Sequence, residues 1–151
     1  MLDWLFFEIG GFFQGHRYLI VYNHGGNLIL DYFPLLPQYQ GKTRPHYHAK
    51  WAKVRSERWL KEFVDMGCEA WQAHYTSDIL DGTQWSLRYK FDGENEHRLS
   101  GSNAFPGNWN RFMEWMENTI SSLPQATDAT VKEVLEAITG HHLKTRGEEP
   151  I

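Results

Sequence analysis

The segment from Asp81 to Phe91 constrains the fold more than any other part of the chain. Its apolar residues occupy every second position, and they are Trp85, Leu87, Tyr89 and Phe91. Because successive side chains of a strand point to opposite faces, this alternation predicts a strand in a sheet that is covered on one side and wet on the other. Asp92-Gly93 then predicts a hairpin turn into a partner strand over residues 97–101.

Further strands are predicted near the N-terminus, over residues 4–9, 16–22 and 27–33. The glycines at 25 and 26 favour a hairpin turn between the last two, since glycine readily adopts a positive φ. Pro34 and Pro37 predict an end to regular structure, because proline has no N–H for a sheet ladder. A short strand is predicted over residues 69–75, whereas residues 35–53 follow no single pattern.

Three helices are predicted, over residues 57–66, 107–121 and 128–139. The first has Ser56 as a candidate N-cap, and Gly67 stands where a glycine commonly ends a helix. The second has a strong apolar stripe with helical spacing, made of Trp109, Phe112, Met113, Met116 and Ile120. Asn103 or Asn108 is a candidate cap for this second helix.

These elements predict an α+β fold, with an antiparallel sheet of five or six strands and two or three helices packed on one face. The length of 151 residues suits one domain. We place that domain at residues 1–140, followed by a flexible polar tail over residues 141–151, where no periodicity remains.

Charge and cysteine content narrow the possible functions. The formal net charge is −4, and the acidic and basic residues are interspersed, which argues against nucleic-acid binding. Cys68 is the one cysteine, so an internal disulfide and a multi-cysteine metal site are excluded, and we expect it to be a small buried apolar residue.

The apolar N-terminus raises the question of a signal peptide, but Asp3 and Glu8 interrupt it and no basic leader precedes it. No apolar run approaches the ~20 residues of a membrane helix. We therefore expect a cytoplasmic protein without membrane association.

Eight histidines are the compositional feature most relevant to chemistry. In an extended segment His46 and His48 would point to the same side and could approach one metal ion. A third ligand is expected from His16, His74 or Glu69. Carboxylates that adjoin strands, Asp31 among them, would support hydrolysis only if they converged in a cleft. The alternative is that these histidines are exposed or lie at an interface, and no cofactor is predicted.

Aromatic residues are unusually frequent around residues 35–53. Trp, Tyr and Arg are common anchors of protein interfaces, so this segment is a candidate contact surface for a protein partner or for a second copy of the chain. The candidate binding residues are Tyr39, Arg44, His46, Tyr47, His48 and Trp51. The alternative is a small second core beneath the segment.

Two motifs, Asp-Gly-x-x-Trp-x-Leu and Gly-x-Asn-x-Phe-Pro, occur about twenty residues apart. Together with Trp71 they comprise Asp81, Gly82, Trp85, Leu87, Gly101, Asn103, Phe105 and Pro106. Over about residues 6–120 the chain resembles a broad group of uncharacterised small proteins from Firmicutes and their mobile elements. The resemblance implies a phage or plasmid accessory protein with a binding or inhibitory role, and it implies no catalytic residues. It also implies that the cytoplasm in question is bacterial, or that of the host if the protein is phage-encoded. From the residues alone, the motifs are expected to be architectural.

Two functional hypotheses follow. The first is a non-enzymatic protein-interaction or inhibitor module, of which an anti-CRISPR-like inhibitor of a host defence nuclease is one version. Its acidic balance would permit competition with nucleic acid for a basic groove. The alternative is a metal-dependent hydrolase that uses His46 and His48.

Overall fold

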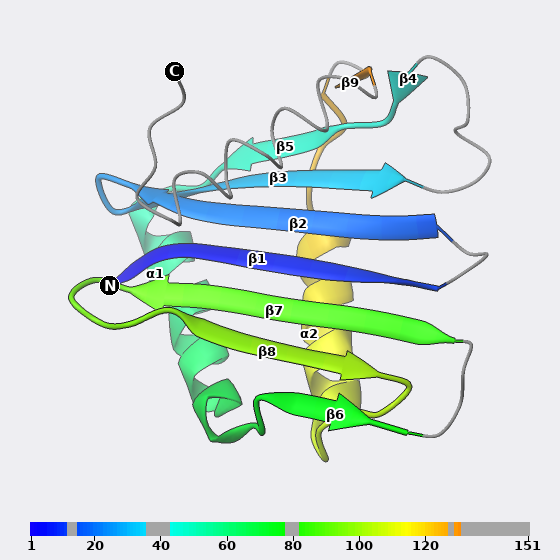
Figure 1. The fold of residues 1–151 in the computed structure, drawn as a ribbon. Coiled ribbons are helices and arrows are strands. Elements are labelled where there is room, and N and C mark those ends of the chain that lie inside the picture. The colour runs from blue at the N-terminus through cyan, green and yellow to red at the C-terminus, as the bar shows by residue number, and fades with distance from the viewer. Residues whose placement is uncertain (12–14, 36–42, 78–81, 127–128, 131–151) are drawn as a thin grey trace, which may run out of the picture.

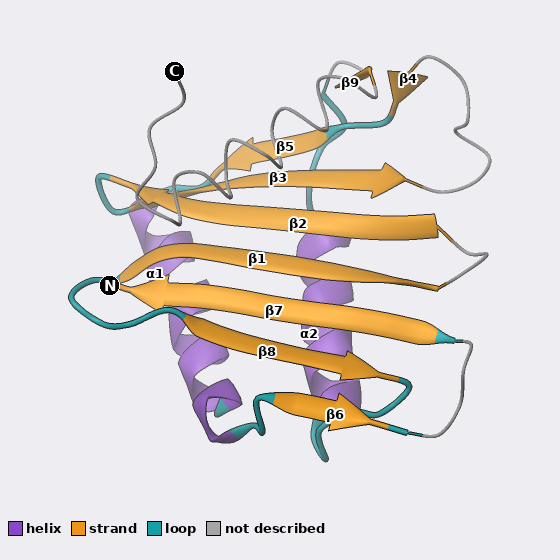
Figure 2. Cartoon of the chain, viewed as in Figure 1, coloured by secondary structure: helices purple, strands orange, loops and turns teal. Residues whose placement is uncertain are grey.

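The computed structural model describes residues 1–11, 15–35, 43–77, 82–126 and 129–130, and shows a seven-stranded sheet with two helices on one face (Figures 1 and 2). The strand order is β5-β3-β2-β1-β7-β8-β6. The strands are β1 (Leu2–Gly11), β2 (Gly15–His24), β3 (Asn27–Leu35), β5 (Tyr47–Lys50), β6 (His74–Thr76), β7 (Thr83–Phe91) and β8 (His97–Ser102). A separate two-residue pairing joins β4 (Thr43–Arg44) to β9 (Ala129–Thr130).

The α+β class is confirmed. The predicted number of strands, five or six, was too small, and the sheet is not wholly antiparallel. The additional strand is β5, which comes from the segment without a sequence pattern. At the opposite edge, β6 runs parallel to β8, while all other neighbours in this sheet are antiparallel. Both α1 (Lys53–Asp65) and α2 (Trp109–Ser121) cover the same face (Figure 2). At the start of the helix predicted over 128–139, residues 129–130 form the strand β9 instead. The other residues of that predicted helix, and the tail, lie outside the described residues.

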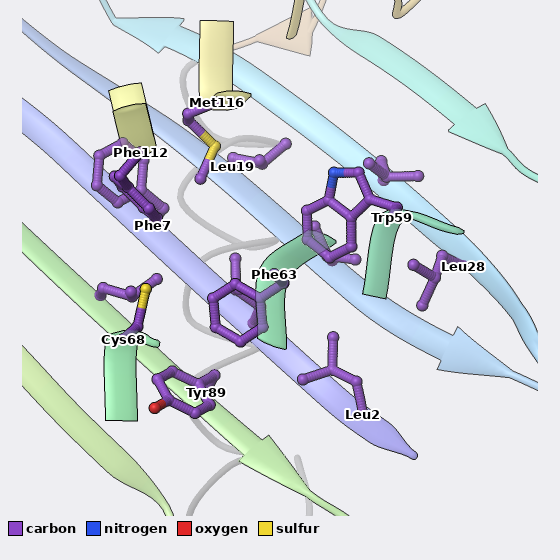
Figure 3. Packing of buried hydrophobic residues seen from close by; sticks show 14 of the residues in the cluster. Leu2, Phe7, Leu19, Leu28, Trp59, Phe63, Cys68, Tyr89, Phe112 and Met116 are labelled. Atoms are coloured by element: carbon purple, nitrogen blue, oxygen red, sulfur yellow. The ribbon is translucent and has the colours of Figure 1, made fainter. Parts of the chain in front are cut away.

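The main core lies between the sheet and the two helices (Figure 3). The alternation along β7 is confirmed, because its core-facing side chains from 85 to 89 are at most 3% exposed. The α2 stripe also faces this core, with Phe112 and Met116 fully buried. Phe112 meets Phe7 edge to face at 5.3 Å, and Phe63 of α1 meets Tyr89 in the same way at 5.0 Å. Aromatic packing thus joins both helices to the central strands.

The first helix begins earlier than the sequence predicted. α1 starts at Lys53, so Ser56 lies inside it and is not the N-cap. The buried Ser56 hydroxyl donates to the carbonyl of Ala52 at 2.9 Å and accepts from the backbone N–H of Leu28 at 2.9 Å. It therefore ties the helix to β3. Gly67 has the expected left-handed conformation just after the helix, with a φ of 67°.

The two sequence motifs interlock, as the architectural interpretation expected. The side-chain oxygen of Asn103 accepts from the N–H of Thr83 at 2.7 Å, and the Trp85 indole donates to the carbonyl of Ala104 at 3.0 Å. Glycine is needed at 101, since a Cβ there would lie 2.1 Å from the Trp85 indole nitrogen. Asn103 therefore joins two strands instead of capping α2.

Asn108 occupies the N-cap position of α2 but makes no side-chain capping hydrogen bond. Its side-chain oxygen accepts from the Trp71 indole at 2.8 Å, and its amide donates to the carbonyl of Met66 at 2.8 Å. The residue thus connects the start of α2 to the end of α1, which fixes the two helices on their shared face.

The far face of the sheet, away from the helices, carries a smaller apolar cluster. Phe6, Ile20 and Phe33 are at most 4% exposed, and Tyr18 and Tyr22 pack against them. Because side chains alternate along strands, residues next to the core-facing ones in β1, β2 and β3 point to this face. The β3–β5 end of the same face holds the cluster of polar groups described next.

Candidate metal centre

Asp31, His46 and His48 converge on the far face of the sheet. The antiparallel register of β3 and β5 places Asp31 directly opposite His48. His46 immediately precedes β5, and its position two residues before His48 puts both imidazoles on one side of the extended segment. The prediction that these two histidines share a side is therefore confirmed.

The donor atoms of the three side chains all lie within 4.8 Å of one another. One carboxylate oxygen of Asp31, Oδ1, is 2.8 Å from Nε2 of His46 and 2.7 Å from Nδ1 of His48. The side chains of Asp31 and His46 are 18% and 24% exposed, and that of His48 is 44% exposed. The cluster is therefore half-buried and opens to solvent on the His48 side.

The surrounding structure holds these ligand-bearing residues in place. The ring of Phe33 stacks on His46, with centroids 4.6 Å apart and an interplanar angle of 8°. On the outer edge of β5, the N–H of His48 donates to the carbonyl of Pro124 at 3.1 Å, and the N–H of Ala126 donates to the carbonyl of His46 at 2.7 Å. With β3 on its other edge, this short segment is fixed on both sides, as a preorganised site requires.

The charge of Asp31 also affects the pKa of the neighbouring Tyr22. Burial raises the pKa of its phenol, and the negative charge of Asp31 raises it further. The carboxylate therefore acts on a neighbouring hydroxyl as well as on the two imidazoles. A cation placed beside Asp31 would oppose this effect.

The group that lies beside His46 and His48 is not one of the three residues expected as a third ligand. His16 lies 3.3 Å from a carboxylate oxygen of Glu8, and His74 is hydrogen-bonded to Ser100 at 2.7 Å. Glu69 belongs to a 3₁₀ turn over Cys68–Ala70. Asp31 takes this place because β5 pairs with β3. The sequence did hold one signal for Asp31, since it is a charged residue within the otherwise apolar strand predicted over 27–33. The strand that pairs with it, β5, had no sequence pattern, so the two could not be matched.

The donor set suits a transition-metal ion. Two imidazoles and one carboxylate are typical of catalytic zinc sites with three protein ligands, and imidazole also suits Cu, Fe and Ni. Around a tetrahedral Zn²⁺ such ligand atoms would lie about 3.3 Å apart. From the 2.7–2.8 Å seen here, side-chain rotations would have to move each nitrogen about half an ångström away from Oδ1. The two imidazole nitrogens, whose separation is at most 4.8 Å, would have to take the same spacing.

Of the remaining residues of the predicted contact surface, the structure describes the side chains of Tyr47 and Trp51, and both point away from this cluster. Tyr39 and the side chain of Arg44 lie outside the described residues. Trp51 is 6% exposed and meets Trp59 edge to face at 6.2 Å, while Tyr47 packs on Tyr32 at 5.7 Å. Trp51 therefore belongs to the main core, and the partly buried Tyr47 packs against that core. This corrects the expectation that these two rings are exposed anchors.

The chain matches no model of a known protein family, and a search of curated proteins finds no significant match. The resemblance to proteins of Firmicutes and mobile elements thus stays a prediction. Within the described part of the chain, no helix combines the length and apolar character needed to cross a membrane.

Proposed function

We propose that the protein binds a divalent transition-metal ion through Asp31, His46 and His48 and uses it for hydrolysis. The observation that carries this proposal is the convergence of two imidazoles and a carboxylate from two paired segments. It develops the alternative hypothesis drawn from the sequence, with Asp31 as the third ligand.

Hydrolysis fits a centre with three protein ligands, because a fourth position then remains for a water molecule. If these residues held a zinc ion, the pKa of such a water would fall to about 7, and hydroxide would be available at neutral pH. Asp31 would neutralise part of the ion's charge, and the ring of Phe33 would keep His46 oriented. The exposed side of His48 offers the approach for a substrate.

Metal binding is tested with untagged protein by calorimetric titration with Zn²⁺ and by the visible absorption of bound Co²⁺. We expect one equivalent to bind to the wild type, and binding to weaken at least tenfold in Asp31→Asn, His46→Ala and His48→Ala. His74→Ala is the matched control, since this exposed histidine contacts Ser100 on another part of the sheet. Equal, substoichiometric binding by all five proteins would refute the metal site.

The hydrolytic part is tested separately on the Zn²⁺-loaded wild type with chromogenic carboxylic and phosphoric esters. Activity should follow metal occupancy across the variants and disappear with a chelator. Stoichiometric metal binding without any hydrolysis of either ester class would overturn the reaction while leaving the metal site standing.

A non-enzymatic protein-interaction or inhibitor module is the second candidate function. It is favoured by a groove of about 230 Å³ between α1 and α2, which Trp59, Trp115, Arg55 and Arg58 help to line. The guanidinium of Arg55 lies 4.2 Å from the centroid of the Trp51 ring. Arg and Trp are frequent hot-spot residues, and two arginines suit an acidic segment of a partner protein.

A double variant, Arg55→Glu with Arg58→Glu, should abolish capture of such a partner, while Lys61→Glu on the same helix should not. A partner that both variants retain would refute the groove as the binding surface. A host defence nuclease, the partner class that the resemblance implies, belongs to this candidate. If the groove instead binds a second copy of the chain, sedimentation of the wild type alone should show a dimer.

A further inference from the structure

A cavity of about 280 Å³ lies on the helix side of the sheet, remote from the Asp31 cluster on the far face. The second half of α1, the 3₁₀ turn Cys68–Ala70 and the β7–β8 hairpin line it. This volume is slightly below the ~300–1,000 Å³ of typical small-molecule sites. The cavity therefore suits a small ligand.

Aromatic rings form the inner wall. Phe63 and Tyr89 meet edge to face at 5.0 Å, and His97 stacks on Tyr89 with centroids 4.6 Å apart and an interplanar angle of 5°. Phe91 also lines the cavity, and Val64, which is 56% exposed, contributes apolar surface that the fold leaves uncovered. Phe63 and Tyr89 are each 2% exposed, so the accessible ring surface belongs to Phe91 and His97. That surface offers apolar contact, and the ring of Phe91 has an electron-rich face that attracts cations.

Apart from the titratable His97, the charged groups among the described lining residues are acidic. Glu69 and Glu94 line it, and neither forms an ion pair with any residue that the structure describes. No Lys or Arg stands among the described lining residues. Burial, the neighbouring Cys68 and both glutamates raise the pKa of Tyr89. The carboxylates thus make the potential at the aromatic wall negative.

The floor of the cavity stays uncharged at neutral pH. Cys68 is 2% exposed, and burial raises the pKa of its thiol to about 12. It therefore acts as apolar surface, and covalent chemistry with a thiolate is not the use of this cavity. A ligand would meet aromatic and thiol groups inside and carboxylates at the rim.

We propose that this cavity binds a small organic cation, an ammonium group attached to an apolar body. The aromatic wall would contact the apolar part and the face of the cation, and Glu69 and Glu94 would supply the opposite charge. A neutral ligand of the same size would lose the electrostatic attraction, and an anion would be repelled. This binding site is independent of the proposed metal centre.

The test uses three aromatic probes of similar size, benzyltrimethylammonium, benzyl alcohol and benzenesulfonate, with affinities measured by NMR titration. We expect the cation to bind most tightly and the anion most weakly. Since exposed charge pairs contribute little each, Glu69→Gln and Glu94→Gln should each weaken the cation about threefold, and the double variant about tenfold. Glu57→Gln, an exposed glutamate on α1 outside the cavity, is the matched control.

Two results would overturn the proposal: equal affinity of the wild type for all three probes, or unchanged cation affinity in the double variant. Val64→Trp, which narrows the mouth, should weaken the cation and the alcohol alike, and unchanged binding there would place the probe elsewhere. Asp31→Asn should leave the cation affinity as it is, so that failure of this site and failure of the metal site are separable.

Discussion

Asn103 provides a test of how the two sequence motifs stabilise the fold. Its φ is 54°, in the left-handed region, and its side-chain oxygen accepts from the N–H of Thr83 at 2.7 Å. Gly82 makes the approach possible, because a Cβ at 82 would lie 1.9 Å from that oxygen. Backbone conformation and hydrogen bonding thus both contribute at this residue, and they can be separated by substitution.

Asn103→Ala should lower the free energy of unfolding by about 2–3 kcal/mol, of which roughly 1–2 is left-handed strain and roughly 1 is the loss of an acceptor for Thr83. Asn103→Gly removes the strain but not the unpaired N–H, so its loss should be about 1 kcal/mol smaller. Asn103→Asp keeps the acceptor and tolerates the conformation, and should change stability by less than about 0.5 kcal/mol.

Urea unfolding followed by tryptophan fluorescence at 25 °C measures all three variants against the wild type. The comparison requires unchanged slopes with denaturant, so that differences in midpoint report stability. The reasoning would be refuted if alanine and glycine destabilised equally, since the conformational term would then be absent. If Asn103→Asp destabilised the protein as much as Asn103→Ala, the hydrogen bond to Thr83 would not contribute to stability as argued.

Three further predictions follow from single residues. Phe112→Ala should cost about 3–5 kcal/mol of stability in urea unfolding, because it empties a fully buried site in the main core, and a loss under about 1 kcal/mol would contradict the packing. Burial raises the pKa of Cys68 to about 12, so this thiol should resist alkylation at pH 8 in the native protein and react once the protein is unfolded. The free energy of unfolding should also fall as the pH rises above the thiol pKa of the unfolded state, because only the unfolded state then releases the proton. Asp31→Asn should lower the pKa of Tyr22 in an ultraviolet titration, because a negative charge that opposes phenol ionisation is removed, and an unchanged pKa would place Asp31 too far from the hydroxyl.

Much of the central sheet and both described helices could be predicted, because their patterns are local. Trp85 to Tyr89 alternate as a half-buried strand must, and Phe112 and Met116 recur with the period of a helix. The errors fell where burial overrode local signals. Ser56 has the chemistry of an N-cap, yet it is buried inside α1, where its hydroxyl binds β3.

The end of regular structure predicted at Pro34 was placed slightly too early, since β3 ends at Leu35. Proline was expected to end regular structure, but Pro34 lies within β3, opposite Arg17 of β2. Pairing of β3 with β5 extends only from Ile29 to Tyr32, so among the described residues position 34 pairs with β2 alone. A strand bordered on one side tolerates a residue without an N–H.

Only part of the candidate site could be predicted from the sequence. The shared side of His46 and His48 follows from their spacing in an extended segment, whatever that segment pairs with. The identity of Asp31 as the third group depends on which strand lies beside β5 and in which register. That choice involves residues far apart in the chain, so no local pattern could specify it.

By itself, the sequence determined the α+β class, the two helices over the core and the side on which the paired histidines point. These properties depend on the period of side chains along one segment. Only the tertiary structure decided that β5 joins the sheet, that Trp51 is buried, and that a carboxylate meets both imidazoles. These properties depend on pairing between segments, which is set by the burial of the whole core and by strand register.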